Sequence, residues 1–175
     1  MSSLLLRIGS YDERLLLALV AQRRPVLDLI MRGVTRLADW PVAVLLTLLM
    51  ALGFIPGLEA IGMQIVWTLG ISHLSVEVLK RVFTRERPAF EPGLEWLVTV
   101  PDRFSFPSGH ATAGMSLAMP LALGLGGLVG SAILLLGVCV GLSRCYLGVH
   151  YPGDVVAGWG LSIITLLSVV FLGLA

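Results

Sequence analysis

The sequence predicts an all-α, multi-pass membrane protein: a bundle of five transmembrane helices preceded by an N-terminal amphipathic helix. Of the 175 residues, 57% are hydrophobic and 13% are charged, whereas charged residues make up roughly 25% of soluble domains. The mean hydropathy is +0.93, and most of the apolar runs approach the roughly 20 residues that a tilted helix needs to cross a bilayer. This length is typical of one domain, so we expect residues 1–175 to form a single membrane-embedded unit.

The five apolar runs define the expected spans. They are Pro41–Pro56, Ile61–Phe83, Ala111–Leu125, Val129–Leu147 and Val155–Ala175. The third helix is expected to begin at Pro107 or Ser108, because proline and serine favour the first positions of helices. Glycines between residues 124 and 130 predict a tight connection into the fourth run, and Pro152-Gly153 predicts another before the fifth. Small residues such as Gly137 suit close contacts between helices in lipid.

Residues 1–40 have a different pattern, which indicates an amphipathic helix lying in the membrane interface. The apolar residues that recur at helical spacing are Leu27, Ile30, Met31, Val34 and Leu37. The alternative is a sixth span formed by residues near 12–38. Pro25 and a set of nearby charges disfavour that crossing, because ionisable side chains are costly in hydrocarbon. The charged residues are Arg23, Arg24, Asp28, Arg32 and Arg36.

Two features of the composition limit the function. The net charge of +1 provides no field that would attract nucleic acid, so we expect no nucleic-acid partner. Cys139 and Cys145 have no zinc-site spacing and cannot form a disulfide framework. Both are therefore expected to be small core residues.

Three polar blocks interrupt the apolar pattern at the ends of the predicted spans. The blocks are Lys80–Pro88, Pro107–His110 and Ser143–Asp154. If the five runs alternate in direction, all three blocks lie at the same membrane face. They bring cations, helix-start amides, two histidines and a carboxylate to one site. Residues of this kind are costly beside lipid, which indicates a functional site.

The first block offers Lys80 and Arg87 as phosphate ligands. Arg81 and Arg85, which lie between them, are expected to be interfacial cations that extend towards lipid headgroups. The polar connection Thr84–Pro107 is long for a compact domain, and such loops are usually functional or mobile.

Lys80 shares one helical face with His73 and Glu77, at spacings of seven and three residues. This stripe is expected to face the interior of the bundle. His73 is expected to be an interior histidine with satisfied hydrogen bonds, and Glu77 to hold Lys80 in place.

The second block is a helix start that contains Ser108, Gly109 and His110. Free amides at a helix N-terminus carry partial positive charge and bind phosphate oxygens. Gly109 allows the backbone to come close to a ligand, and the Ser108 hydroxyl adds a donor.

The third block places His150 and Asp154 four residues apart, with Arg144 six residues before His150. A carboxylate near an imidazole fixes its tautomer and stabilises its charged form. The arginine adds a cation at the same membrane face.

Two other chemistries fit these residues less well. Ser108, His150 and Asp154 have the residue types of an acyl-transfer triad, but a triad has no need of three surrounding cations, and the Gly-x-Ser-x-Gly elbow is missing. A metal site is disfavoured because the cations would repel a divalent ion. A doubly charged phosphate does need several fixed cations.

The motifs resemble those of the type 2 phosphatidic acid phosphatase family, which shares its site with the vanadium haloperoxidases. The family pattern is Lys-x6-Arg-Pro, then Pro-Ser-Gly-His, then Ser-Arg-x5-His-x3-Asp. The matching residues are Lys80, Arg87, Pro88, Pro107, Ser108, Gly109, His110, Ser143, Arg144, His150 and Asp154. The motif region covers residues 80–154, and the membrane members of the family commonly have six spans.

The resemblance implies a role for each matched residue. His150 would attack phosphorus, Asp154 would orient His150, and His110 would protonate the leaving oxygen and then activate water. The phosphate would be held by a shared set of donors, which are Lys80, Arg87, Ser108, Gly109 and Arg144. No metal and no other cofactor would be required.

The expected partners are a membrane lipid phosphate and the bilayer, and the expected location is the cell membrane. Candidate substrates are phosphatidate, phosphatidylglycerol phosphate, and polyprenyl phosphate or diphosphate. The alternatives are a non-catalytic headgroup-binding protein or transporter and a vanadate-dependent oxidase. The positive-inside rule places the site in the cytoplasm, whereas bacterial members of the family more often have it outside, so the side stays open, as does the oligomeric state.

Overall fold

The structure, a computed structural model, describes residues 3–89, 95–100 and 102–174. Its regular elements are α1 (Ser3–Val20), α2 (Pro25–Thr35), the 3-10 helix η1 (Arg36–Ala38), α3 (Trp40–Ala51), α4 (Glu59–Phe83), α5 (Gly109–Leu125), α6 (Gly127–Tyr146) and α7 (Pro152–Phe171). Extended pairing within these ranges is limited to one isolated bridge between Glu86 and Phe104. The all-α prediction is therefore confirmed.

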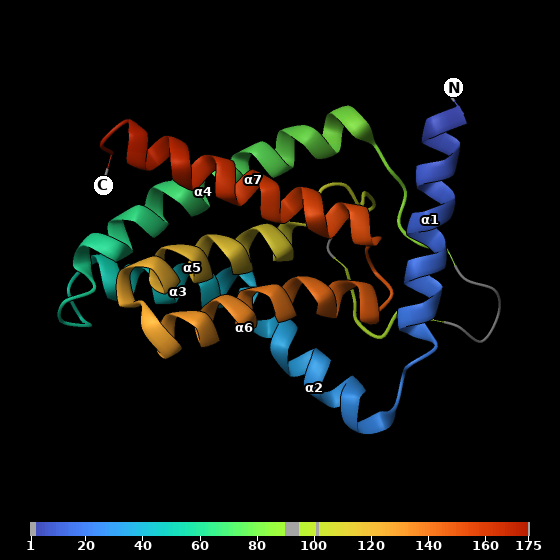
Figure 1. The fold of residues 1–175 in the computed structure, drawn as a ribbon, viewed down its shortest axis with the longest axis horizontal. Helices are drawn as coiled ribbons and strands as arrows, with labels where there is room; N and C mark the ends of the chain where they lie inside the picture. Colours follow the sequence, from blue (N-terminus) through green and yellow to red (C-terminus); the bar gives the residue numbers. More distant parts are fainter. Residues whose placement is uncertain (1–2, 90–94, 101, 175) are drawn as a thin grey trace.

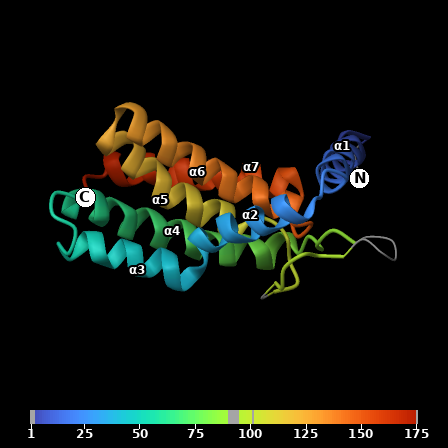
Figure 2. The ribbon, with the colours of Figure 1, turned by 90° about the horizontal axis from the view of Figure 1, so that it is seen from below.

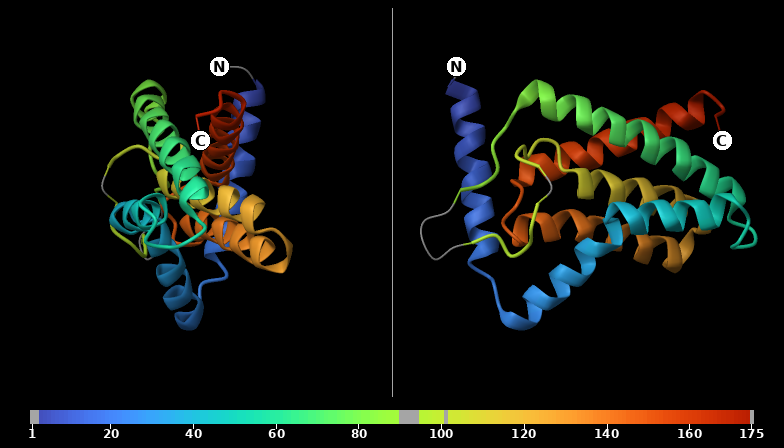
Figure 3. Two further views of the ribbon diagram at one scale, coloured as in Figure 1. Left: turned by 90° about the vertical axis from the view of Figure 1, so that its left-hand side faces the viewer. Right: turned by 180° about the vertical axis from the view of Figure 1, so that it is seen from behind.

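Helices α3 to α7 run lengthwise in an elongated bundle, and α1 lies across one of its ends (Figure 1). α5 is central and packs against α3, α4, α6 and α7. The view from below shows α2 leading from the end near α1 towards α3 (Figure 2). In the rear view, α1 again stands crosswise at the end where α4 finishes and α7 begins (Figure 3). This end of the bundle therefore collects the termini of several helices.

Two of the predicted spans meet the length and composition expected of a membrane-crossing helix, namely α6 and α7 with 20 residues each. The segments Pro25–Ala38 and Trp40–Ala51 meet it only together, with a bend of 51° between them. α5 has 17 residues, and the 25-residue α4 contains His73 and Glu77. The count of five spans therefore stays a prediction.

The N-terminal 40 residues form α1, α2 and η1 instead of one amphipathic helix. Pro25 is the first residue of α2, where its fixed φ favours a helix start. α1 does not lie apart from the bundle, because Leu16 and Val20 are buried in a cluster that includes residues of α5, α6 and α7. This docking was not expected from the sequence.

Small residues allow α5 and α6 to pack closely. Residues 111–118 of α5 are all buried. A Cβ atom added at Gly137 would lie 2.5 Å from the Cβ of Ala118, closer than two carbon atoms can approach. Glycine at this position therefore sets the α5–α6 distance, as expected for helices that pack in lipid.

Candidate functional site

The predicted site residues converge at the end of the bundle that α1 covers. Lys80 is in the last turn of α4, Arg144 is in the last turn of α6, and Asp154 is in the first turn of α7. A cavity of about 750 Å³ is lined by six of the eight predicted residues, which are Lys80, Arg87, Gly109, His110, Arg144 and His150. Ser108 and Asp154 are fully buried behind it.

His150 lies in the connection between α6 and α7 and is 2% exposed. Its Nε2 atom is 3.1 Å from Arg87 Nη1, and its Nδ1 atom is 3.5 Å from Asp154 Oδ2. Because a guanidinium only donates hydrogen bonds, Nε2 is the acceptor and the ring proton is on Nδ1, facing Asp154. The tautomer therefore directs the Nε2 lone pair towards Arg87, which lines the cavity together with His150.

Burial lowers the pKa of His150 to about 4, and the neighbouring Arg144 and Arg87 contribute in the same direction against Asp154. The imidazole is therefore neutral at neutral pH. Neutral imidazole is the form that can act as a nucleophile.

Two of the predicted phosphate ligands share one partner that the sequence did not reveal. Lys80 Nζ is 2.7 Å from Asp102 Oδ2, and Arg87 Nη2 is 2.9 Å from Asp102 Oδ1. Arg87 also donates through Nη1 to the Val149 carbonyl at 2.9 Å. The expectation that Glu77 holds Lys80 was wrong, because the side chain of Lys80 turns to the 84–107 connection.

Asp102 is ionised in this setting. Burial raises the pKa of its carboxyl group, but Lys80 and Arg87 lower it more, so the net shift is downwards. Its charge offsets part of the repulsion between the two cations.

Arg144 is 3% exposed and donates from Nη1 to Thr35 Oγ1 at 2.8 Å. Its Nε atom is buried and has no hydrogen-bond partner in the part of the chain that the structure describes. An arginine with spare donors beside a cavity is suited to bind an anion with two or more oxygens.

Ser108 is the N-cap of α5, as the sequence predicted. Its side chain accepts from the Ala111 amide at 3.4 Å, and its own amide donates to the Asp154 carbonyl at 3.0 Å. The hydroxyl thus fixes the start of α5, and the amide connects that start to α7. Gly109 follows at the cavity wall.

His110 has a carboxylate partner that sequence reasoning missed. Its Nε2 atom lies 3.0 Å from Asp39 Oδ1. Asp39 precedes Trp40, the first residue of α3, and therefore lies at the bend after η1. An aspartate before Trp-Pro at the start of an apolar run is a helix-capping signal, but that signal does not indicate a histidine partner.

Arg85 is not the interfacial cation that we expected. Its Nη1 donates to Asp154 Oδ1 at 2.8 Å, and its Nη2 donates to Asp12 Oδ2 at 2.7 Å. The guanidinium also lies 4.2 Å from the centre of the Tyr151 ring. Burial lowers the pKa of Arg85, but Asp154 and Asp12 raise it more, so the group stays charged. Arg81 is exposed, as expected.

Asp12 connects α1 to this network. It is buried and also accepts from the Gly153 amide at 2.7 Å. Asp154, in turn, accepts from the Tyr151 amide through Oδ2 at 2.9 Å. The carboxylate beside His150 is therefore fixed by its own helix start and, through Arg85, by α1.

His73 and Glu77 line the cavity, as their shared face with Lys80 predicted. Both side chains are exposed, and neither forms a hydrogen bond or ion pair with any residue in the described ranges. The expectation of a satisfied interior histidine was therefore wrong.

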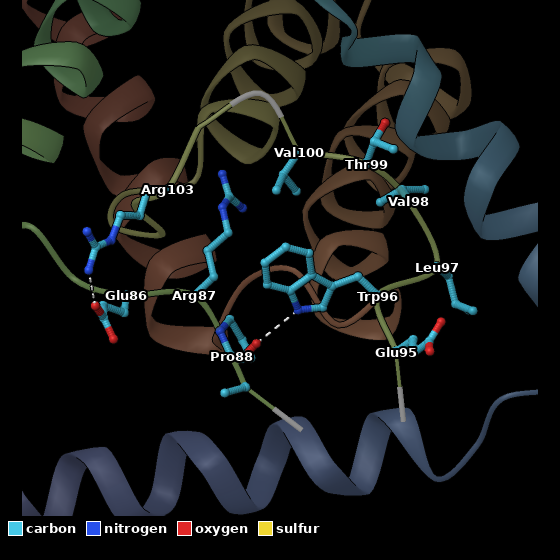
Figure 4. A pocket seen from close by; sticks show the side chains of 11 residues that line it. Glu86, Arg87, Pro88, Glu95, Trp96, Leu97, Val98, Thr99, Val100 and Arg103 are labelled. Carbon is cyan, nitrogen blue, oxygen red and sulfur yellow. Dashed lines mark hydrogen bonds and ion pairs between the residues drawn. The ribbon is translucent and has the colours of Figure 1, made fainter. Parts of the chain in front are cut away.

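A second cavity of about 970 Å³ lies beside the 84–107 connection (Figure 4). Arg87 borders it, and Trp96 Nε1 donates to the Pro88 carbonyl at 2.9 Å on its floor. An exposed ion pair of 2.6 Å joins Arg103 and Glu86 at the rim. Arg87 thus lines both this cavity and the one that His150 lines.

Comparisons with known proteins agree with this geometry. The model of the PAP2 superfamily matches residues 61–173. Phosphatidylglycerophosphatase B of Bacillus subtilis is 30% identical over 168 residues, which cover 90% of this chain and 80% of that protein. Decaprenylphosphoryl-5-phosphoribose phosphatase of Mycolicibacterium smegmatis is 46% identical over 88 residues, 50% of this chain, and the match spans only about half (47%) of that relative.

Two solved structures have a similar fold. The crystal structure of a transmembrane PAP2-type phosphatidylglycerolphosphate phosphatase from Bacillus subtilis gives a TM-score of 0.79 at 27% identity, covering 95% of this chain and 86% of that one. The crystal structure of Aquifex aeolicus LpxE gives a TM-score of 0.79 at 25% identity, covering 90% and 93% respectively.

Proposed function

This chain belongs to the PAP2 superfamily, and we propose that it is an integral-membrane phosphatase that hydrolyses a lipid phosphate or diphosphate through a phosphohistidine intermediate. The observation that carries the proposal is the setting of His150. His150 lines a cavity together with Lys80, Arg87 and Arg144; its Nε2 atom faces Arg87 and its Nδ1 atom faces Asp154. A nucleophile among three cations fits phosphoryl transfer, which depends on positioning and charge stabilisation.

The substrate phosphate binds in this cavity. Lys80, Arg87 and Arg144 neutralise its charge, and the two arginines contribute planar guanidinium groups that suit phosphate oxygens. Ser108 and the Gly109 amide at the start of α5 complete the set of donors. All of these groups belong to the chain, so the proposal needs no metal ion.

In the first step, His150 Nε2 attacks phosphorus, an N–P bond forms, and the P–O bond to the lipid breaks. His110 gives a proton to the leaving oxygen. Asp154 accepts from the Nδ1 proton and stabilises the positive charge that develops on the ring, the role of a carboxylate beside a catalytic imidazole. Asp39 orients His110 for the proton transfer.

In the second step, His110 takes a proton from water as the water oxygen attacks phosphorus. The N–P bond breaks, inorganic phosphate leaves, and His150 returns to its neutral form. One acid–base group thus serves both halves of a two-step covalent reaction.

The lipid tail lies in the apolar part of the same cavity. This part runs between α3 and α4 and is lined by Val44, Leu48, Val66, Leu69 and Leu74. We place the protein in the cell membrane, with phosphatidate, phosphatidylglycerol phosphate and polyprenyl phosphates or diphosphates as candidate substrates.

The test is phosphate release by the purified full-length protein in detergent, with each candidate lipid and with EDTA present. We expect turnover with EDTA and inhibition by orthovanadate, which adopts the five-coordinate geometry of the transition state. Loss of activity with EDTA that magnesium restores would contradict the metal-free mechanism. Lipid binding without any phosphate release would indicate a headgroup-binding protein instead, and peroxidase activity with bound vanadate would indicate an oxidase.

The intermediate has its own test. Rapid acid-free quenching with radiolabelled substrate should trap acid-labile phosphate on the wild-type protein and none on His150→Ala. His110→Ala should slow turnover by about 10²–10⁴-fold, the usual contribution of general acid–base catalysis. Arg81→Ala is the matched control, because Arg81 is exposed. Labelled phosphate on His150→Ala would refute the assignment of the nucleophile.

A further inference from the structure

Asp102 has a position that the proposed catalytic steps leave unexplained. Its side chain lines the same cavity as His150, and the residue stands on the connection between α4 and α5. Its Oδ2 atom is 2.7 Å from Lys80 Nζ, and its Oδ1 atom is 2.9 Å from Arg87 Nη2. The carboxylate thus bridges two of the three cations assigned to the substrate phosphate, with one oxygen on each.

The hydrogen-bond donors of Arg87 are largely engaged. A guanidinium has five N–H groups and no acceptor. Nε donates to the Asp102 carbonyl and Nη2 to the Asp102 carboxylate, both at 2.9 Å. Nη1 donates to the Val149 carbonyl and to His150 Nε2. One N–H group remains, so a contact with two phosphate oxygens requires Arg87 to release one of these partners.

The Asp102 carboxylate is the partner that can give way. The carbonyl groups of Asp102 and Val149 belong to the main chain, whereas the carboxylate moves by rotation of a short side chain. This side chain is 33% exposed, against 3% for Arg87. It can therefore exchange the two cations for water, which a carboxylate buried away from water cannot do without losing all its partners.

Arg144, the third cation, has a different setting. Its Nη1 atom donates to Thr35, and its Nε atom is buried without a partner in the ranges that the structure describes. An anion that enters the cavity therefore meets one cation with spare donors and two that already hold a carboxylate.

We propose that Asp102 is an exchange partner for phosphate: its carboxylate neutralises Lys80 and Arg87 in the empty site, gives way when a phosphate binds, and returns to them as inorganic phosphate leaves. The proposal rests on the proposed function, because it places the phosphate at these two cations. The exchange breaks no covalent bond and replaces one anion by another. Phosphate affinity is lowered by the charged hydrogen bonds that are given up, so the product is held weakly.

A carboxylate that only supported the cations would have the opposite effect. If Asp102 stayed in place during binding, its removal would leave Lys80 and Arg87 to repel each other, and the two side chains would lose the orientation that a phosphate needs. Phosphate binding would then weaken. The direction of the change in phosphate affinity therefore distinguishes exchange from support.

The test measures binding of inorganic phosphate to the full-length protein in detergent. The variants are Asp102→Asn and Asp102→Ala, since alanine has no amide that could itself bind phosphate. Glu86→Gln is the matched control: it also removes one negative charge from the connection between α4 and α5, but Glu86 pairs with the exposed Arg103. Affinity is taken from the rise in melting temperature with phosphate concentration, against sodium chloride at equal ionic strength, and from inhibition of lipid turnover.

We expect phosphate to bind about 10- to 100-fold more tightly to both Asp102 variants, the usual effect of hydrogen bonds to charged groups. Glu86→Gln should change the affinity by less than about threefold. Without phosphate, the Asp102 variants should melt at a lower temperature than the wild-type protein, because two cations lose their counter-ion, and phosphate should restore the difference.

Unchanged or weaker phosphate binding in the Asp102 variants would overturn the exchange, and so would tighter binding in Asp102→Asn alone, which would assign the effect to the new amide. Neither result affects the proposed function if the wild-type protein releases phosphate from a lipid. A wild-type protein that hydrolyses no lipid would overturn the proposed function, while the melting temperatures would still show whether Asp102 competes with phosphate. The two failures are therefore distinguishable.

Discussion

Arg144 has a role in the predicted site that a lysine cannot take over. Its guanidinium reaches Thr35 through Nη1 and keeps Nε unused in a buried position. Lysine has no planar fork with which to reproduce both functions.

We therefore expect Arg144→Lys to reduce transition-state stabilisation by about 2–4 kcal/mol, comparable to the loss of one preorganised donor. The measurement is kcat/KM for phosphate release at matched thermal stability. Arg81→Lys is the control and should change little, because Arg81 is exposed. If both variants lost the same activity, the division into site cations and interfacial cations would be wrong.

Asp39 offers a second test at the residue scale. Its carboxylate lies 3.0 Å from His110 Nε2, so Asp39→Asn should remove a charge that favours the protonated, proton-donating form of His110. With a lipid substrate we expect kcat to fall by about 10- to 100-fold, as for other hydrogen bonds to charged groups. With p-nitrophenyl phosphate, whose leaving group needs no proton, the loss should be much smaller. An equal loss on both substrates together with a lower melting temperature would mean that Asp39 only supports the fold.

The predicted site residues could be found because of where they stand in the sequence. Their neighbours in the network could not be found in this way. Lys80, Arg87, His110, Arg144 and His150 stand at the ends of apolar runs, where an ionisable side chain already requires a function. Two carboxylates of the surrounding network come from elsewhere in the fold: Asp39 pairs with His110 across 71 positions, and Asp12 pairs with Arg85 across 73. Only tertiary packing brings such pairs together, so no local pattern predicts them.

At the scale of elements, α1 contributes a side chain to the network around Asp154, the carboxylate beside His150. Asp12 holds both Arg85 and the Gly153 amide, and Leu16 and Val20 dock the helix against the bundle. The position of Asp154 therefore depends on a helix that the sequence placed at the interface.

Asp12→Asn should consequently lower kcat by about 10- to 100-fold through the loss of a charged hydrogen-bond partner. KM should change little, because Lys80, Arg87 and Arg144 do not contact Asp12. Glu13→Gln is the matched control, as Glu13 is the next residue and is exposed. A lower melting temperature with unchanged kcat would assign Asp12 a purely structural role.

A predicted helix start agrees with the structure where a capping residue determines it. Ser108 caps α5 as expected. Pro152 and Gly153, which were expected in the connection before the last helix, are instead the first two residues of α7. The bend at Asp39 was not expected, because the apolar run that begins at Pro41 looked like a separate span. The structure instead joins α2, η1 and α3 into a chain bent by 51°, which places Asp39 beside His110.

At the scale of the whole molecule, burial of His150 makes stability depend on pH. Folding lowers the pKa of His150 from 6.5 to about 4, so the unfolded chain binds a proton more readily between these values. The contribution of the neutral imidazole is complete above pH 6.5 and is lost as the pH falls towards 4. The melting temperature of the wild-type protein should therefore fall over this range.

The control for this effect is His150→Gln, which removes the titrating group. Its melting temperature should fall less between pH 7 and pH 4.5 than that of the wild-type protein in the same detergent. Parallel curves for the two proteins would show that other groups cause the acid sensitivity.

The cavity between α3 and α4 has a consequence for kinetics. Its flank is made by Trp40, Leu48 and Leu74, which are large apolar side chains that remain exposed. A substrate that enters through this flank arrives by diffusion within the membrane plane, so its mole fraction among the surrounding lipids sets the encounter rate. In mixed micelles, adding inert detergent at fixed amounts of enzyme and substrate should slow turnover in proportion to this surface dilution. A rate that instead followed the bulk concentration would mean that the lipid enters from water.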